Sequence, residues 1–284
     1  MIATLGGLGA AAIFATATLC SSRSTRMLGA SPVLAWVMTI GLVIVAPWAA
    51  VEGLPTGVDG GDVAWLAVAG LGNVLGLLLA YTALRIGKVG IVAPVVSTEG
   101  AIAAVISLAA GEHLGAGVAV TLAGIAIGIL LASTAPDPNP GPAQAPPRVY
   151  AAYALSAALS FGVSLYATAR VSAALPVVWA LMPARLAGVA IIALPLAVTA
   201  RMRLTRRALP LVLASGVAEV AGFGLFAVGS RHGIAVTAVL ASQFGAIAAV
   251  AGFVLFRERL APVQLAGVVT IVAGVSVLSV LQAS

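Results

Sequence analysis

The sequence predicts an all-α integral membrane protein with ten transmembrane helices in two inverted five-helix repeats. Hydrophobic residues make up 62% of the 284 residues and charged residues only 8%, too few charges to cover the surface of a water-soluble domain. The hexapeptide at residues 100–105 also recurs unchanged at residues 245–250. If each copy belongs to a unit of five spans, an odd number, the second unit crosses the bilayer in the opposite orientation.

Ten apolar runs, separated by short polar breaks, are long enough for bilayer spans of about 20 residues. Inside hydrocarbon the backbone polar groups must be satisfied by the protein, which restricts spans to helices or closed barrels. The alternating pattern of a barrel strand is absent, so helices are expected. The predicted helices cover residues 2–20, 32–51, 63–81, 89–110, 116–133, 150–172, 177–199, 208–229, 233–256 and 262–281.

A proline-rich stretch separates the two halves of the chain. Between residues 136 and 147 prolines recur too densely for a helix to continue. Similar landmarks lie on both sides of this stretch at an offset near 145 residues. We therefore expect a first five-helix repeat over residues 1–133, a linker over 134–149 and a second repeat over 150–284.

Short motifs occur at matching places in the two halves. A Glu-x-Leu step follows the fourth predicted helix of each half, within residues 111–114 and 256–260. Together with Pro176 and Arg185 in an early helix of the second half, these motifs resemble the EamA branch of the drug/metabolite transporter superfamily. The resemblance implies a multi-pass transporter of a bacterial-type inner (plasma) membrane, with no enzyme activity and no cofactor. It also implies that the Glu-x-Leu steps have a structural or gating role.

The basic residues of the predicted loops are divided unevenly between the two sides of the membrane. Lysine and arginine favour cytoplasmic loops, so their distribution places both termini outside. The resemblance instead implies that both termini lie in the cytoplasm, and the two arguments leave the orientation open. The richer side carries Arg23, Arg26, Arg85, Lys88, Arg148, Arg201, Arg203, Arg206, Arg207, Arg257 and Arg259.

Glu99 is the first candidate for substrate binding or coupling. It lies about ten residues into a predicted helix, and a rise of about 1.5 Å per residue brings it near the bilayer centre. Its counterpart in the second repeat is Gln243, an amide that does not titrate. Because burial favours the neutral carboxyl, Glu99 either takes up and releases a proton during transport or donates a structural hydrogen bond.

Arg185 and Glu219 are opposite charges in two predicted helices joined by one connection. In one interpretation the arginine binds the carboxylate of a zwitterionic substrate and the glutamate binds its ammonium group. In the other, the two side chains pair with each other and close the bundle.

Four uncharged residues complete the candidate site. Asn73 and Gln243 can form hydrogen bonds either to a substrate or between helices. Trp36 and Trp179 occupy nearly equivalent places in the repeats. They either line a cavity against an apolar or cationic group or lie at the membrane interface, where tryptophan is common.

The function that these residues favour is export of a small polar metabolite, such as an amino acid, by alternating access between the inverted repeats. An exporter of lipophilic or cationic drugs is the alternative, although only 5% of the residues are aromatic. An intramembrane enzyme would need clustered polar groups near the interface, which the short loops do not offer. No nucleotide-binding loop is present, so ATP is not expected to drive transport directly. Transport is then either coupled to proton exchange or occurs by facilitated diffusion.

The expected partners are a small-molecule substrate, the lipid bilayer and, for coupled transport, protons. The formal charge of +6 is explained by loop arginines that set topology, so no nucleic acid partner is expected. His113 and His232 have no companion ligands at metal-binding spacing, so no metal site is expected. Small-residue faces can pack within the bundle or between subunits, which leaves the oligomeric state open.

Overall fold

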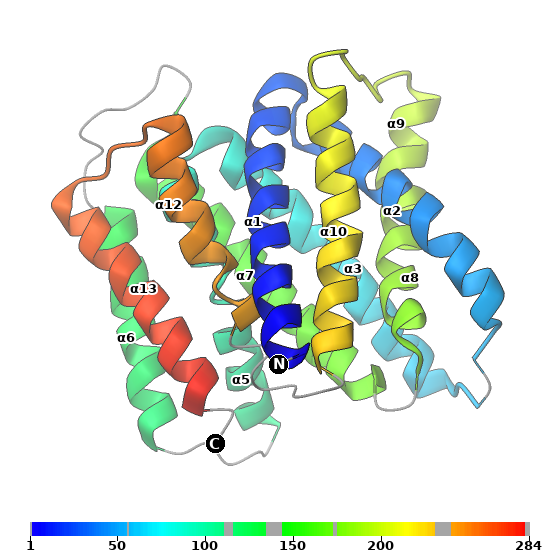
Figure 1. Cartoon of the computed structure of the whole chain (residues 1–284), viewed down its shortest axis with the longest axis horizontal. Helices are drawn as coiled ribbons and strands as arrows, with labels where there is room; N and C mark the ends of the chain where they lie inside the picture. Colours follow the sequence, from blue (N-terminus) through cyan, green and yellow to red (C-terminus); the bar gives the residue numbers. More distant parts are fainter. Residues whose placement is uncertain are drawn as a thin grey trace.

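The protein is a bundle of helices that lie side by side (Figure 1). The structure is a computed structural model that describes residues 2–55, 57–110, 116–134, 144–172, 175–230 and 240–281. Every regular element in these ranges is a helix, which confirms the all-α prediction. The helices are α1 (Ile2–Leu28), α2 (Ala30–Glu52), α3 (Gly60–Ile86), α4 (Val89–Val96), α5 (Glu99–Ala109), α6 (Ala116–Thr134), α7 (Pro147–Ser172), α8 (Val177–Gly188), the π-helix η1 (Val189–Ala193), α9 (Leu194–Val198), α10 (Leu209–Ser230), α12 (Phe244–Phe256) and α13 (Pro262–Leu281).

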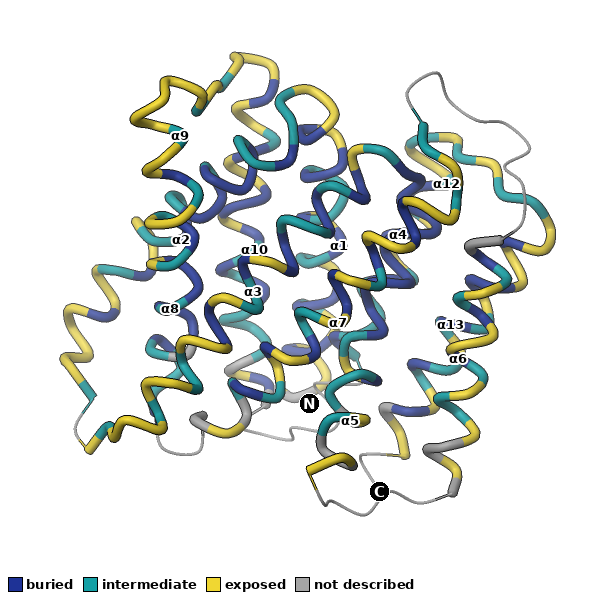
Figure 2. Tube along the Cα trace, turned by 180° about the vertical axis from the view of Figure 1, so that it is seen from behind, coloured by how far each residue is buried: buried dark blue, intermediate teal, exposed yellow. Residues whose placement is uncertain are grey.

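The outer surface of the bundle is apolar. In the described ranges, six helical segments are long and apolar enough to cross a membrane, and several shorter apolar helices accompany them. Exposed residues lie along the outer sides of the bundle (Figure 2), and many are large and apolar, among them Val120, Val198 and Val254. Such a surface is suited to lipid rather than water. The chain is therefore a multi-pass membrane protein, while the count of ten spans and the inverted repeat stay predictions.

Helix α1 continues past its predicted end at residue 20 to Leu28. The hydroxyls of Ser24 and Thr25 donate to backbone carbonyls one turn earlier, and Arg26 donates to the backbone at the end of α3. The helix stops where Gly29 adopts a φ of 96°, a conformation that glycine accepts without strain. Arg26 was predicted to lie in a loop but is part of α1. Its guanidinium donates to the carbonyl oxygens of Leu84 and Gly87.

The helix predicted over 89–110 is broken into α4 and α5. Pro94 has no backbone N–H to continue the helical hydrogen bonds. The hydroxyls of Ser97 and Thr98 donate to the carbonyls of Pro94 and Val95 at 2.9 and 2.7 Å. Glu99 is consequently the first residue of α5, whereas the sequence placed it inside a continuous helix.

The helix predicted over 177–199 also departs from regular α geometry. Its α8 segment continues through the π-helix η1 into α9. Pro195 follows this wider segment, lacks an N–H and would crowd the carbonyl four residues earlier in a regular helix. A π segment at this place accommodates the proline without ending the helix.

Glycines bring the first half (residues 2–134) and the second half (residues 144–281) into close contact. A Cβ added at Gly267 of α13 would lie 2.6 Å from the carbonyl oxygen of Gly128 in α6. Gly6 of α1 meets Gly229 of α10 in the same way, with 2.7 Å to its Cα. Small residues permit this approach of membrane helices. The two halves therefore form one packed bundle rather than two separate units.

Parts of the prediction lie outside the described residues. These parts include the start of the predicted helix 233–256, much of the predicted linker, and both histidines (His113 and His232). Helix α7 begins at Pro147, inside the stretch expected to be linker. Proline is favoured in a first helical turn because its missing N–H would have no intrahelical partner there.

Candidate functional site

Arg185 and Glu219 form an ion pair in the interior of the bundle. Arg185 Nη2 lies 3.8 Å from Glu219 Oε2, and the two side chains are 1% and 12% exposed. Arg185 comes from α8, and Glu219 comes from the middle of α10. A single charge buried in a membrane protein is costly, so each of these charges compensates the other. The structure thus brings together the two opposite charges that the sequence singled out.

Arg185 packs closely against α2 because residue 41 is a glycine. A Cβ added at Gly41 would lie 2.9 Å from Arg185 Cδ, so glycine leaves the room that the arginine occupies. Arg185 Nη1 donates to Met38 Sδ at 3.8 Å, whereas Nε has no hydrogen-bond partner. The guanidinium is therefore fixed in place and still has a donor for another group.

Tyr81 of α3 adds a buried hydroxyl that the sequence reasoning missed. Its side chain is 3% exposed and interacts electrostatically with Glu219 and Arg185. Ser21 of α1 and Ser215 of α10 lie nearby and share a hydrogen bond of 2.5 Å. Tyr81 lies eight residues after Asn73 on α3, and residues at this spacing share a helix face. This spacing was the only signal for Tyr81 in the sequence.

Glu99 belongs to the same central group. It follows the break between α4 and α5 and lies close enough to Glu219 for the two carboxyl groups to interact electrostatically. Its backbone packs on α7, where a Cβ added at Gly162 would lie 3.1 Å from the carbonyl oxygen of Glu99. The ion pair of Arg185 and Glu219 thus has a second carboxyl group, from another helix, within electrostatic range of Glu219.

Asn73 and Trp36 each carry a buried polar atom without a hydrogen-bond partner, Oδ1 and Nε1 respectively. Asn73 lies at the middle of α3, on the same helix as Tyr81, and Trp36 lies on α2, close in sequence to Met38. Buried polar groups in proteins are nearly always hydrogen-bonded. These unpaired atoms therefore mark places where a bound molecule or water is expected to supply a partner.

Gln243 and Trp179, the remaining candidates, make bonds between helices. Gln243 Nε2 donates to Ser276 Oγ at 2.9 Å, which links the start of α12 to α13. Trp179 Nε1 donates to the carbonyl oxygen of Gly53 at 2.9 Å, just after the end of α2. An exposed helix end is a usual place for tryptophan in a membrane protein. The bond of Gln243 is consistent with its helix–helix interpretation, and the place of Trp179 is consistent with its interface interpretation.

The interior of the bundle contains charged and polar groups that are able to form ion pairs and hydrogen bonds. Within the ranges that the structure describes, no three His, Cys, Asp or Glu side chains are grouped to hold a metal ion. The group instead contains one guanidinium, two carboxyl groups and several unpaired hydrogen-bonding atoms. A multi-pass helical membrane protein with a polar centre is the class that this fold and this site define.

The model of the EamA-like transporter family matches residues 1–134, which confirms the resemblance drawn from the sequence. The match covers the first part of the chain, which is thus similar to the EamA-like transporter family.

The fold extends over the whole chain. A solved crystal structure, described only as that of a protein, covers 99% of this chain and 98% of its own, with a TM-score of 0.65 and 18% sequence identity. At this identity the likeness shows the fold alone. The search of curated proteins finds no match to the chain.

Proposed function

We propose that the protein is a secondary transporter that exports small polar metabolites, such as amino acids, across a bacterial-type inner membrane. Two inverted halves would rock against each other and open the centre of the bundle to one side at a time. The observation that carries the proposal is the buried ion pair of Arg185 and Glu219, with unpaired polar atoms on the same helices or their neighbours.

The ion pair is suited to a zwitterion. An amino acid presents a carboxylate and an ammonium group a short distance apart. Arg185 has a free Nε–H for the carboxylate, and Glu219 can accept from the ammonium. Without substrate the two side chains compensate each other at 3.8 Å, and on binding each exchanges its partner for a substrate group. The pair then acts both as a closing contact and as the binding site.

Glu99 gives the site one more carboxyl group than it has guanidinium groups. With Glu99 and Glu219 both ionised, Arg185 would compensate the charge of Glu219, and the charge of Glu99 would stay uncompensated in a medium of low dielectric constant. A proton or a cationic substrate must neutralise it. We therefore assign proton coupling to Glu99, and the same excess of negative charge favours the alternative function, export of lipophilic or cationic drugs.

Transport by purified protein in liposomes tests the proposal. We expect saturable uptake of radiolabelled neutral amino acids that unlabelled amino acids inhibit, and no uptake of the lipophilic cation tetraphenylphosphonium. Uptake of tetraphenylphosphonium without amino acid uptake would instead favour the drug-export function.

Glu99→Gln is expected to remove the response of transport to a pH gradient. The amide keeps the size of the side chain and its hydrogen bonding but carries no exchangeable charge, so accumulation driven by a pH gradient should fall by about tenfold or more. Substrate exchange without a gradient should continue. The matched control is Glu52→Gln, which changes an exposed carboxylate at the end of α2. Unchanged gradient-driven accumulation in the Glu99→Gln variant would show that Glu99 does not carry the proton.

A further inference from the structure

Buried hydroxyl groups lie on one side of the ion pair of Arg185 and Glu219. Ser215 lies one helical turn before Glu219 on α10, so the two side chains share a helix face. The hydroxyl of Ser215 is hydrogen-bonded to that of Ser21 on α1 at 2.5 Å, and these serines are 0% and 1% exposed. The hydroxyl of Tyr81 on α3 lies near both serines and interacts electrostatically with Glu219. Three helices thus contribute hydroxyl groups next to one carboxyl group.

Helix α1 differs in character on the two sides of this hydroxyl group cluster. Before residue 21, the residues of α1 that the structure describes as buried are all glycine or alanine. From residue 21 to the end of the helix, every buried residue carries a hydroxyl group: Ser21, Ser22, Ser24 and Thr25. The buried hydroxyl groups of α1 therefore extend toward the face of the protein at which this helix ends, and not toward the face at which it begins.

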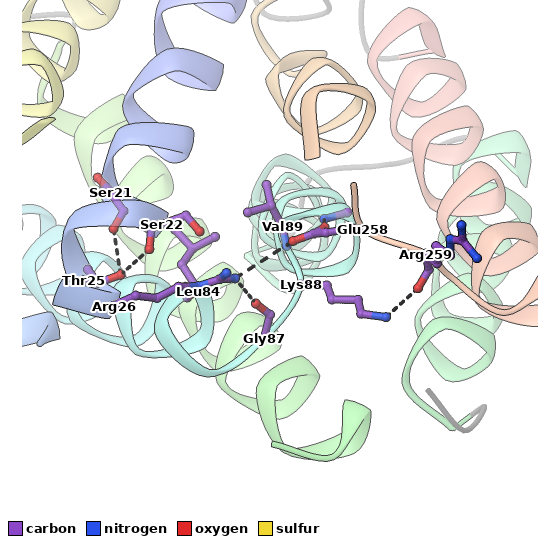
Figure 3. Close-up of polar contacts among 11 residues, drawn as sticks. Ser21, Ser22, Thr25, Arg26, Leu84, Gly87, Lys88, Val89, Glu258 and Arg259 are labelled. Carbon is purple, nitrogen blue, oxygen red and sulfur yellow. Dashed lines mark hydrogen bonds and ion pairs between the residues drawn. The ribbon is translucent and has the colours of Figure 1, made fainter. Parts of the chain in front are cut away.

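These hydroxyl groups follow the last turns of α1 as far as Arg26 (Figure 3). Thr25 Oγ1 donates to the carbonyl oxygen of Ser21 at 2.7 Å, and the same oxygen has lone pairs with which to accept. Ser22 Oγ is buried and has no hydrogen-bond partner. Buried hydroxyl groups are nearly always hydrogen-bonded, so a water molecule is expected to bind there. The polar lining thus continues beyond the hydrogen bond of Ser21.

The polar lining reaches water at Arg26, whose side chain is 40% exposed. The guanidinium donates to the carbonyl oxygens of Leu84 at 3.3 Å and Gly87 at 2.7 Å, at the end of α3. These bonds place the last turns of α1 and α3 side by side. Tyr81, about one turn before Leu84, therefore lies at the level of Ser21, between Arg26 and the centre of the bundle.

Fixed charges hold the helix ends together at this face. Arg26 lies 4.0 Å from Glu258, which is in the loop between α12 and α13. Glu258 also caps the start of α4, because its carboxylate accepts hydrogen bonds from the backbone N–H groups of Val89 at 2.9 Å and Gly90 at 2.8 Å. Lys88 interacts electrostatically with the same carboxylate. The outer end of the polar lining is thus bordered by two cations and one carboxyl group.

The inner end of the polar lining faces the candidate site. Glu219 lies 3.8 Å from Arg185, and Glu99 of α5 interacts electrostatically with Glu219. Because Arg185 compensates one carboxylate, the second carboxyl group is neutral only while it holds a proton or a cationic substrate. A proton that this pair of carboxyl groups takes up or releases needs a route to water.

We propose that the hydroxyl groups of Tyr81, Ser21 and Ser215 form a proton relay between Glu219 and the face at which α1 ends. The inference rests on the proposed proton coupling. In each step a hydroxyl oxygen accepts a proton on a lone pair while its own proton moves to the next acceptor. One proton leaves the central carboxyl groups for each proton that reaches water at Arg26, and no hydroxyl group changes its charge.

A pH step followed by infrared spectroscopy tests the relay without any substrate. The pH of the detergent-purified protein is lowered rapidly, and the C=O stretching band of protonated carboxyl groups is recorded over time. The part of this band that is missing in Glu99→Gln and Glu219→Gln belongs to the central carboxyl groups. We expect the relay variants Ser21→Ala, Ser215→Ala and Tyr81→Phe to slow its appearance by about tenfold or more, with an unchanged final amplitude.

The matched control is Ser24→Ala. Ser24 is also a 0% exposed hydroxyl residue of α1, but it donates to the carbonyl oxygen of Cys20 within its own helix, so its removal should leave the rate at the parental value. The serine variants keep the test valid if Tyr81→Phe does not fold.

The outcomes separate the relay from the proposed function. Parental rates in the relay variants, or a changed amplitude at an unchanged rate, would show that these hydroxyl groups only support the structure. A parent protein without a band from the central carboxyl groups would instead contradict proton coupling itself, and the relay with it. Because no substrate is used, both results are independent of whether amino acids are transported.

Discussion

Replacing Arg185 by methionine is expected to abolish substrate transport and to lower the stability of the protein. Methionine fills much of the space beside Met38 and Gly41 but leaves Glu219 buried without its partner. Breaking a buried ion pair by removing one partner costs about 3–5 kcal/mol. The measurements are thermal unfolding of the detergent-purified protein and amino acid uptake in liposomes.

The double variant Arg185→Met, Glu219→Gln separates the two effects. It removes both charges, so the penalty for an unpaired buried charge disappears and stability should return close to that of the parent. Transport should stay absent, because neither end of a zwitterion finds its partner. Recovery of transport together with stability would mean that the pair only holds the bundle together.

Replacing Gly267 by valine is the change with the second largest expected effect. A Cβ at this position would lie 2.5 Å from the backbone nitrogen of Ala132 and 2.6 Å from the carbonyl oxygen of Gly128. Neither atom belongs to a side chain that can move away, so α6 and α13 must separate. We expect a loss of about 3 kcal/mol or more, at the upper end of what overpacking costs.

The matched control for this change is Gly124→Val in α6, where an added Cβ meets no atom within 4 Å. Both variants place the same β-branched side chain in a membrane helix, so intrinsic helix propensity cancels in the comparison. Thermal unfolding should distinguish them clearly. Equal stability of the two variants would contradict the close contact of α6 with α13.

The apolar composition was sufficient to predict a helical membrane protein. Inside lipid the backbone polar groups must bond to each other, which excludes open sheets and irregular segments. Arg185 and Glu219 could be singled out from the sequence because an ionisable residue inside an apolar span is costly and therefore rare. Their pairing was one of two open interpretations. The structure places them 3.8 Å apart, a distance that depends on how α8 and α10 pack.

The contacts that sequence reasoning missed involve groups without a sequence signal. The partners of Glu258 are backbone N–H groups, which every residue except proline possesses, and they lie 168 and 169 residues away in the chain. Pro94 interrupts the hydrogen bonding of α4, and the position of the break that follows depends on the hydroxyls of Ser97 and Thr98. Tyr81 was overlooked because its only signal was its place eight residues after Asn73, on the same face of the helix.

The cap of α4 by Glu258 has a consequence for the order in which the protein is assembled during synthesis. Val89 and Gly90 are made long before residue 258, so their N–H groups lack this acceptor while the first half enters the membrane. Helix α4 also has no lipid-facing surface, and its neighbours from the second half arrive later. The loop between α12 and α13 therefore completes the start of α4, and the packing around α4 is finished only after the second half has been made.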